Sequence, residues 1–198
     1  MNYRVCCVVL GVGLCSFAGV SEADVGLFDS ISDQLGPREI AVGESMRANA
    51  RGSMAVTLNP SGLSLTSEVA FEATVGMRPG DDGKSTTISG CDSAARIQGC
   101  YYYRFFQSEP TIGDTTLKFK AHEAGVVYSR RITQNVVIGS TARYIDFESE
   151  GDSFDGVTMD LGATMILTPR LNLGVVGYNL LATKSAVYER AIGVGVAA

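Results

Sequence analysis

The stretch GVTMDLGATMIL, residues 156–167, decides the fold class of this chain. Its apolar side chains fall on alternate positions, namely Val157, Met159, Leu161, Ala163, Met165 and Leu167. The positions between them carry Thr158, Asp160, Gly162 and Thr164. Successive side chains of a β-strand point to opposite faces, so this stretch predicts a strand with one apolar face and one polar face.

Similar alternation recurs in residues 69–78 and 136–144, and less regularly in residues 116–130, 170–180 and 188–198. These spans have about the length that a tilted strand needs to cross a membrane. A soluble β-sandwich would show the same alternation, with its apolar faces packed together. Three features favour the membrane: the length of the strands, their Gly- and Thr-rich polar faces, and short turns alternating with long connections. We read the turns at 131–135 and 168–169 as short, and the connections at 79–115 and 148–155 as long.

The expected fold is therefore all-β, an antiparallel transmembrane β-barrel or part of one, formed by residues 67–198. The chain has 198 residues, 45% of them apolar and 19% charged, with 23 glycines, which suits one β-rich domain with many turns. A net charge of −5 without clustered Lys and Arg argues against a nucleic-acid partner. The sequence contains no Trp, so Tyr and Phe alone would form any aromatic girdle.

Residues 1–23 have the pattern of a cleaved signal peptide. Arg4 supplies the positive charge, residues 5–20 are apolar, and Ser21-Glu22-Ala23 is a small-x-small cleavage site. We expect export through the inner membrane of a Gram-negative cell and location in its outer membrane. Residues 24–66 do not alternate and are predicted to form an N-terminal plug-like segment, with a short helix around Leu27–Leu35 that Gly36-Pro37 ends. Asn59-Pro60-Ser61-Gly62 fits a type I turn.

Only two cysteines, Cys91 and Cys100, follow the predicted cleavage site. Their even number and an oxidising destination predict a disulfide, which we place in an external loop. Closing so short a loop is worth about 2–3 kcal/mol. Two unpaired thiols, or half of a metal site, are the alternatives, and no neighbouring His or further Cys favours the metal.

Several motifs are similar to FadL-like and PorV-like outer-membrane β-barrels, the superfamily of long-chain fatty-acid transporters. The run 38–65 resembles the N-terminal region of these proteins, where small residues lead into an Asn-Pro-Ala-Gly-Leu turn before the first strand. Here Asn59-Pro60-Ser61-Gly62-Leu63 has Ser61 in place of Ala. Residues 137–144 and 173–180 also look like strands of that superfamily. The resemblance implies a barrel partly plugged by its N-terminal segment, through which hydrophobic compounds pass into the periplasm or sideways into the bilayer.

The strand count departs from that family, whose barrels have about fourteen strands, while six are predicted here. Eight strands close the smallest single-chain barrels. Either the chain is the front half of a longer protein, or further strands lie in residues 84–90 and 101–106, which would give eight. The last strand also lacks the terminal aromatic residue with which such barrels commonly end.

Catalytic and metal-binding motifs are weak, so we do not expect an enzyme, a metal or a cofactor. His122 is the only histidine, and neither Cys91 nor Cys100 has a neighbouring base. The acidic residues of 148–155 lack the spacing of a Ca²⁺ loop and read as a solvated loop. The alternation assigns four charged residues to the lumen, where they would form a network or contact a polar headgroup: Glu72, Arg78, Arg143 and Asp160.

The aromatic block Tyr101, Tyr102, Tyr103, Phe105 and Phe106 is interpreted as an interfacial girdle or wall strand, with capture of an apolar ligand or of a cell-surface partner as the alternative. Two functions remain open. The first is passive uptake of hydrophobic compounds such as long-chain fatty acids, and the second is a non-transport outer-membrane scaffold for surface, secretion or motility complexes. A soluble secreted β-domain is a third reading. Outer-membrane lipid is the expected partner, with hydrophobic small molecules as ligands.

Overall fold

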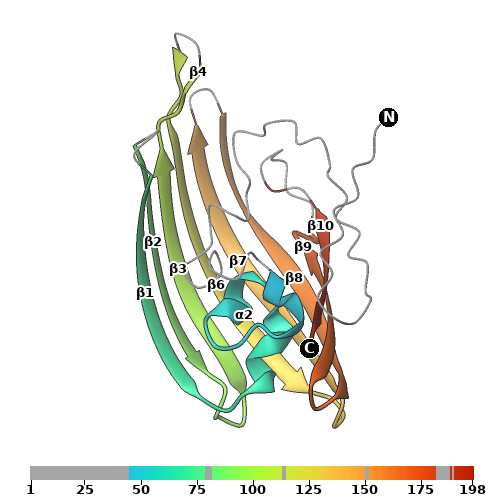
Figure 1. The fold of residues 1–198 in the computed structure, drawn as a ribbon. Helices are drawn as coiled ribbons and strands as arrows, with labels where there is room; N and C mark the ends of the chain where they lie inside the picture. The colour runs from blue at the N-terminus through green and yellow to red at the C-terminus, as the bar shows by residue number, and fades with distance from the viewer. Residues whose placement is uncertain (1–44, 79–81, 113–114, 150–151, 182–187, 189) are drawn as a thin grey trace, which may run out of the picture.

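One antiparallel sheet of eight strands dominates the computed structural model, which describes residues 45–78, 82–112, 115–149, 152–181, 188 and 190–198. The strand order is β1-β2-β3-β6-β7-β8-β9-β10, so sequential neighbours pair throughout (Figure 1). The strands are β1 (Val69–Arg78), β2 (Gly83–Asp92), β3 (Gln98–Ser108), β6 (Phe119–Arg131), β7 (Val136–Ser149), β8 (Asp152–Thr168), β9 (Leu171–Tyr178) and β10 (Ala191–Ala197). A separate small hairpin joins β4 (Thr111–Ile112) to β5 (Thr115–Thr116).

The structure confirms the all-β prediction, and it also confirms the option that strands lie in residues 84–90 and 101–106. They are part of β2 and β3, so the long connection predicted over 79–115 is wrong. The long connection at 148–155 is wrong too, because β7 and β8 continue to Ser149 and from Asp152. Alternation is hard to see in β2, which has small polar residues on both faces, and in β3, which has aromatic residues on both.

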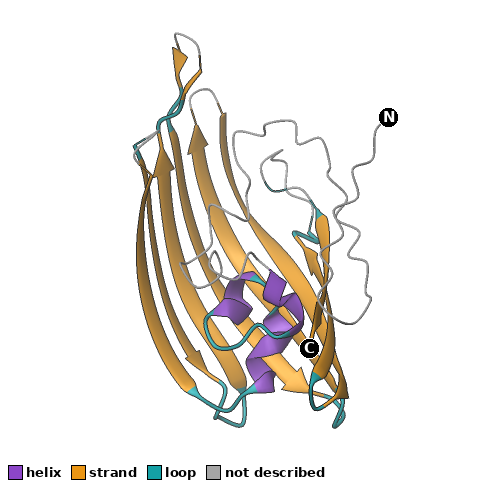
Figure 2. Ribbon diagram, viewed as in Figure 1, coloured by secondary structure: helices purple, strands orange, loops and turns teal. Residues whose placement is uncertain are grey.

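The sheet is curved but not closed into a barrel. Among the described residues, β1 pairs only with β2 and β10 pairs only with β9. The concave side holds a helical segment, residues 45–65, made of η2 (Ser45–Ala48), α2 (Met54–Thr57) and η3 (Pro60–Leu65) (Figures 1 and 2). None of the helices in the described ranges is long and apolar enough to cross a membrane.

The apolar side chains of the sheet are exposed and the polar ones are buried, which is the reverse of the arrangement in a soluble β-sandwich. On β8 the apolar Val157 and Leu161 are 58% and 47% exposed, whereas Thr158 and Asp160 are 0% and 2% exposed. The same holds along the other strands of the sheet, where the exposed large apolar side chains include Val69, Phe71, Val75, Met77, Ile88, Tyr101, Tyr103, Val126, Tyr128, Ile138, Tyr144, Val175, Ile192, Val194 and Val196. The predicted alternation is thus present, and its apolar face is the convex one.

The two ends of the sheet also differ. Three connections, at 93–97, 132–135 and 169–170, lie at one end, which we call the short-turn end. The opposite end carries the longer connections 109–118 and 179–190. The helical segment lies nearer the short-turn end (Figure 2).

Candidate functional site

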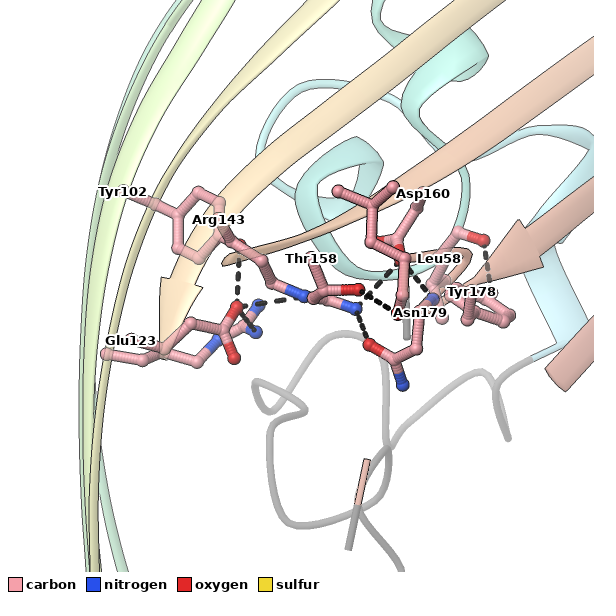
Figure 3. A network of polar contacts seen from close by, with 10 residues as sticks. Leu58, Tyr102, Glu123, Arg143, Thr158, Asp160, Tyr178 and Asn179 are labelled. Carbon is pink, nitrogen blue, oxygen red and sulfur yellow. Dashed lines mark hydrogen bonds and ion pairs between the residues drawn. The ribbon is translucent and has the colours of Figure 1, made fainter. Parts of the chain in front are cut away.

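A polar network crosses the concave face at the middle of the sheet (Figure 3). Its members come from four neighbouring strands and from the turn that ends β9, namely Tyr102, Arg104, Glu123, Arg143, Asp160 and Asn179. Each is at most 7% exposed. The network shares the concave face because every strand member stands at an inward position of its alternating strand.

Glu123 receives contacts from both sides through one carboxylate oxygen. The hydroxyl of Tyr102 donates to its Oε1 at 2.6 Å, and Nη1 of Arg104 lies 3.3 Å from the same atom. Nη1 of Arg143 approaches it at 3.7 Å from β7. Arg104 also lies over the Tyr102 ring, with 5.0 Å between the guanidinium carbon and the ring centre. These contacts tie β3, β6 and β7 together on one face.

Arg143 continues the network to β8 and beyond. Its Nη2 donates to Oδ1 of Asp160 at 2.8 Å and to Oδ1 of Asn179 at 2.6 Å. The backbone N–H of Asn179 donates to the same Asp160 oxygen at 2.8 Å. Asn179 has φ 51°, a left-handed conformation that Asn tolerates better than most residues, and it turns the chain away at the end of β9.

The charges of the network balance, since Arg104 and Arg143 face Glu123 and Asp160. Buried ions are stable only when they are paired and hydrogen-bonded, so a balanced set is what burial requires. Buried atoms without a hydrogen-bond partner among the described residues nevertheless include Glu123 Oε2, Thr141 Oγ1 and Arg143 Nε. An acceptor, a hydroxyl and a donor of this buried network are therefore not used by the side chains of the described residues.

The helical segment is bound to the sheet beside this network. Nη2 of Arg104 donates to Oγ1 of Thr57 at 2.5 Å, so one network member also holds α2. The hydroxyl of Tyr178 donates to the carbonyl of Leu58 at 2.6 Å and accepts from Nε of Arg47 at 3.3 Å. These hydrogen bonds connect the helical segment to β3 through Arg104 and to β9 through Tyr178.

The turn at Asn59-Pro60-Ser61-Gly62 begins the 3-10 helix η3. The N–H of Gly62 donates to the carbonyl of Asn59 at 3.0 Å, which is the bond of the predicted turn, and Asn59 Oδ1 accepts from the Ser61 N–H at 3.1 Å. The Ser61 hydroxyl lies 2.8 Å from the hydroxyl of Thr164 on β8. All four residues are buried, and this turn is where the helical segment contacts the sheet.

Close approach of the helical segment explains the glycines at positions 139 of β7 and 162 of β8. Gly139 and Gly162 are register partners, and a Cβ on either would overlap the backbone or side chain of Asn59-Pro60-Ser61. On β9, a Cβ at Gly174 would lie 2.6 Å from the carbonyl oxygen of Arg47. Glycine thus makes room for the helical segment along the sheet.

An apolar cluster occupies the concave face beyond the network, toward the end with the longer connections. It contains Ala121, Ile145, Phe147 and Tyr188, with Phe106, Phe119 and Phe154 packed against them. Ile145 is the register partner of Glu123, so the cluster borders the network directly. Burial, and then the nearby charge of Glu123, raise the pKa of the Tyr188 hydroxyl above its usual range.

Cys91 and Cys100 form the predicted disulfide. They do not lie in a loop, because they are register partners on β2 and β3, next to the short-turn end. Both are buried under Ala55, Val56 and Leu63 of the helical segment. The loop placement failed because the strands β2 and β3 were not recognised around the two cysteines.

The aromatic block is divided between the two faces of β3. Tyr101 and Tyr103 are exposed on the convex face and Phe105 is half-buried there, whereas Tyr102 is in the network and Phe106 in the apolar cluster. The five residues therefore lie in one strand but do not form one surface. His122, beside them on the convex face, lies with its Nδ1 2.6 Å from the Tyr103 hydroxyl.

The remaining candidates lie apart from the network. Glu72 accepts a hydrogen bond from the hydroxyl of Ser53 and is half-buried at β1. Arg78 ends β1, and its side chain lies outside the described residues. Residues 1–44, with the predicted signal peptide and first helix, also lie outside them. Arg143 and Asp160 are the two candidates that the structure brings together.

Sequence reasoning missed Tyr102, Arg104, Glu123 and Asn179 as network members. Glu123 and Arg104 stand at inward positions, and strict alternation through Phe119–Arg131 and Gln98–Ser108 would have found them. No group of side chains in the described part of the chain has the composition and spacing of a metal site. Searches found no matching protein-family model, no similar curated protein and no similar solved structure.

Proposed function

We propose that this protein is an outer-membrane β-barrel protein whose wall includes the eight-stranded sheet and whose interior is plugged by residues 45–65. The observation that carries the proposal is the exposure of apolar side chains on the convex face together with the burial of polar ones on the concave face. In water, such a surface would be an aggregation hazard. In a bilayer, the same surface faces lipid, and the polar face lines the interior.

The dimensions of the apolar surface support this. From Val157 to Leu167, β8 runs about 33 Å at ~3.3 Å per residue, which a tilt of ~45° reduces to about 23 Å. Outer-membrane barrels have an apolar band of about 25 Å. On β6 the ionisable Lys120 and Arg130 stand at outward positions on either side of Ala124, Val126 and Tyr128. Charges thus bound the apolar surface at both ends of that strand.

We further propose that the protein passes hydrophobic compounds through its wall. The apolar cluster supports this function, because barrel interiors are ordinarily polar and an aromatic inner surface suits an apolar ligand. Residues 152–158 of β8 support a sideways exit. Among the described residues their strand pairing is with β7 alone, since the pairing with β9 begins at Leu161 and the Leu180 N–H still donates to the Met159 carbonyl at 2.8 Å. An open edge in lipid is costly, so the wall is weakest there.

A scaffold role is the second candidate, and the outer edges of β1 and β10 favour it. Neither edge has a second strand partner among the described residues, and a strand of a partner protein could pair with either. The inner apolar cluster favours uptake over this alternative, because a scaffold has no need of an aromatic inner surface.

Membrane fractionation with an uptake assay tests the proposal. Cells expressing the protein should hold it in the outer-membrane fraction and should accumulate radiolabelled hexadecane faster than cells without it. Recovery in the soluble periplasm without detergent would contradict the membrane proposal. Outer-membrane location with unchanged hexadecane uptake would favour the scaffold.

A further inference from the structure

We infer that the inner face selects hydrophobic compounds whose polar end is uncharged, such as long-chain alcohols, over ionised amphiphiles. The inference rests on the proposed uptake function and names its substrate class. It is drawn from the boundary where the apolar cluster meets the polar network, and from the count of charges there.

The boundary is continuous over four strands. Moving toward the end with the longer connections, Arg104 is followed on the same face by Phe106, Glu123 is preceded by Ala121, and Arg143 is followed by Ile145. On β8, Thr158 is preceded by Gly156 and Phe154. A ligand whose body lies against the aromatic side chains therefore has its polar end at the network.

The network offers hydrogen bonds to that polar end, but no net charge. Glu123 Oε2 can accept, Arg143 Nε can donate and the Thr141 hydroxyl can do both, and all three are buried without a hydrogen-bond partner among the described residues. A hydroxyl group is both donor and acceptor, so one alcohol can use this set. Leaving such groups unused costs about 1–3 kcal/mol each, which gives a polar ligand a reason to bind there.

An ionised headgroup is disfavoured because both guanidinium groups already face carboxylates. Arg104 is paired with Glu123, and Arg143 with Glu123 and Asp160, so a bound anion would be a third negative charge against two positive ones. The charges of a pocket of about 330 Å³ at the rim of β3, β6 and β7 balance as well, with Lys118 and Lys120 beside Glu109 and Glu148. Neither polar zone supplies a spare positive charge for a carboxylate or sulfonate.

Photolabelling of the full-length protein in phosphatidylethanolamine–phosphatidylglycerol vesicles tests the inference. The three probes are dodecanol, dodecyl sulfonate and dodecane, each with a diazirine at the middle of its chain. Adducts are assigned to single residues by mass spectrometry, so that the inner Ile145 and Phe147 are separated from the outward Tyr144. Dodecanol should label the inner residues at least about tenfold more than the sulfonate, the ratio expected when a buried charge goes unmatched.

Equal or stronger inner labelling by the sulfonate would overturn the inference while leaving the uptake function in place. Absence of inner labelling by both dodecanol and dodecane would overturn the uptake function itself. Glu123→Gln removes one negative charge and should raise inner labelling by the sulfonate, whereas Asp155→Asn, the same loss of charge at an exposed position of β8, should leave it unchanged. The comparison of probes on the unaltered protein stands even if the Glu123 variant does not assemble.

Discussion

Gly139 on β7 and Gly162 on β8 are register partners, and residues 59–61 lie against both, with their backbone over Gly139 and the side chains of Asn59 and Pro60 over Gly162. The helical segment can take this position because neither glycine has a Cβ atom, which at either site would overlap residues 59–61. Ser61 and Thr164 then fix the contact through their hydroxyl groups, 2.8 Å apart.

Gly162→Ala should loosen the helical segment without unfolding the sheet. The new methyl overlaps the side chain of Asn59, and overpacking of this kind costs about 1–3 kcal/mol. Trypsin should then cut at Arg47 or Arg51 faster than in the unaltered protein. Gly177→Ala is the matched control, because its Cβ meets only the flexible Leu180 side chain, at 3.0 Å. Equal rates in the two variants would contradict the docking role of Gly162.

Leu161→Arg should impair assembly in the outer membrane, because Leu161 lies at the middle of the apolar stretch of β8 on the exposed convex face. A cation near the bilayer midplane costs about 2–4 kcal/mol. Ser153→Arg, also exposed on β8 but outside that stretch, is the control and should assemble normally. Heat-modifiable migration of the extracted protein measures assembly, and similar losses in both variants would argue against a lipid-facing surface.

Arg143→Met should destabilise the protein strongly, because it leaves Asp160 buried without its cation. Breaking a buried pair from one side costs about 3–5 kcal/mol. Arg143→Met combined with Asp160→Asn should recover part of this loss in urea unfolding. Lys120→Met, which breaks the exposed pair with Glu148, should cost no more than about 1 kcal/mol. If the single and double variants at 143 and 160 unfold alike, the pair is not the source of the stability.

Replacing Cys91 and Cys100 together by Ser should lower the free energy of unfolding by about 2–3 kcal/mol through the loss of loop closure. Thiol reagents should label neither cysteine in the unreduced protein. Since both are at most 5% exposed, labelling after mild reduction should also require denaturant. Full labelling of the native, unreduced protein would exclude the disulfide.

The sequence was most informative where one face of a strand is uniformly apolar. In β8, six apolar residues at every second position predict a strand and show which residues share a face. The exposed and buried residues of the structure follow this pattern. β2 and β3 were less readable for opposite reasons. The run from Lys84 to Gly90 is small and polar on both faces, and Tyr101–Phe106 is aromatic on both, so neither has the contrast on which periodicity depends.

The candidate site was predictable in part. Arg143 and Asp160 could be placed on the inner face from local alternation, but their partners could not be chosen. Glu123 and Asn179 lie 20 and 36 residues away from Arg143 along the chain, and only the register of the strands brings them within reach. Gly139 and Gly162 indicate positions where another segment could approach the sheet closely, but the sequence does not show which segment does so.

The position of the disulfide predicts an order of events during folding. Cys91 and Cys100 lie beneath Ala55, Val56 and Leu63, so an oxidase can reach the two thiols only while the helical segment is still away from the sheet. We therefore expect the bond between β2 and β3 to form before the segment docks. If oxidation came late, the segment could cover the reduced thiols and leave the bond unformed.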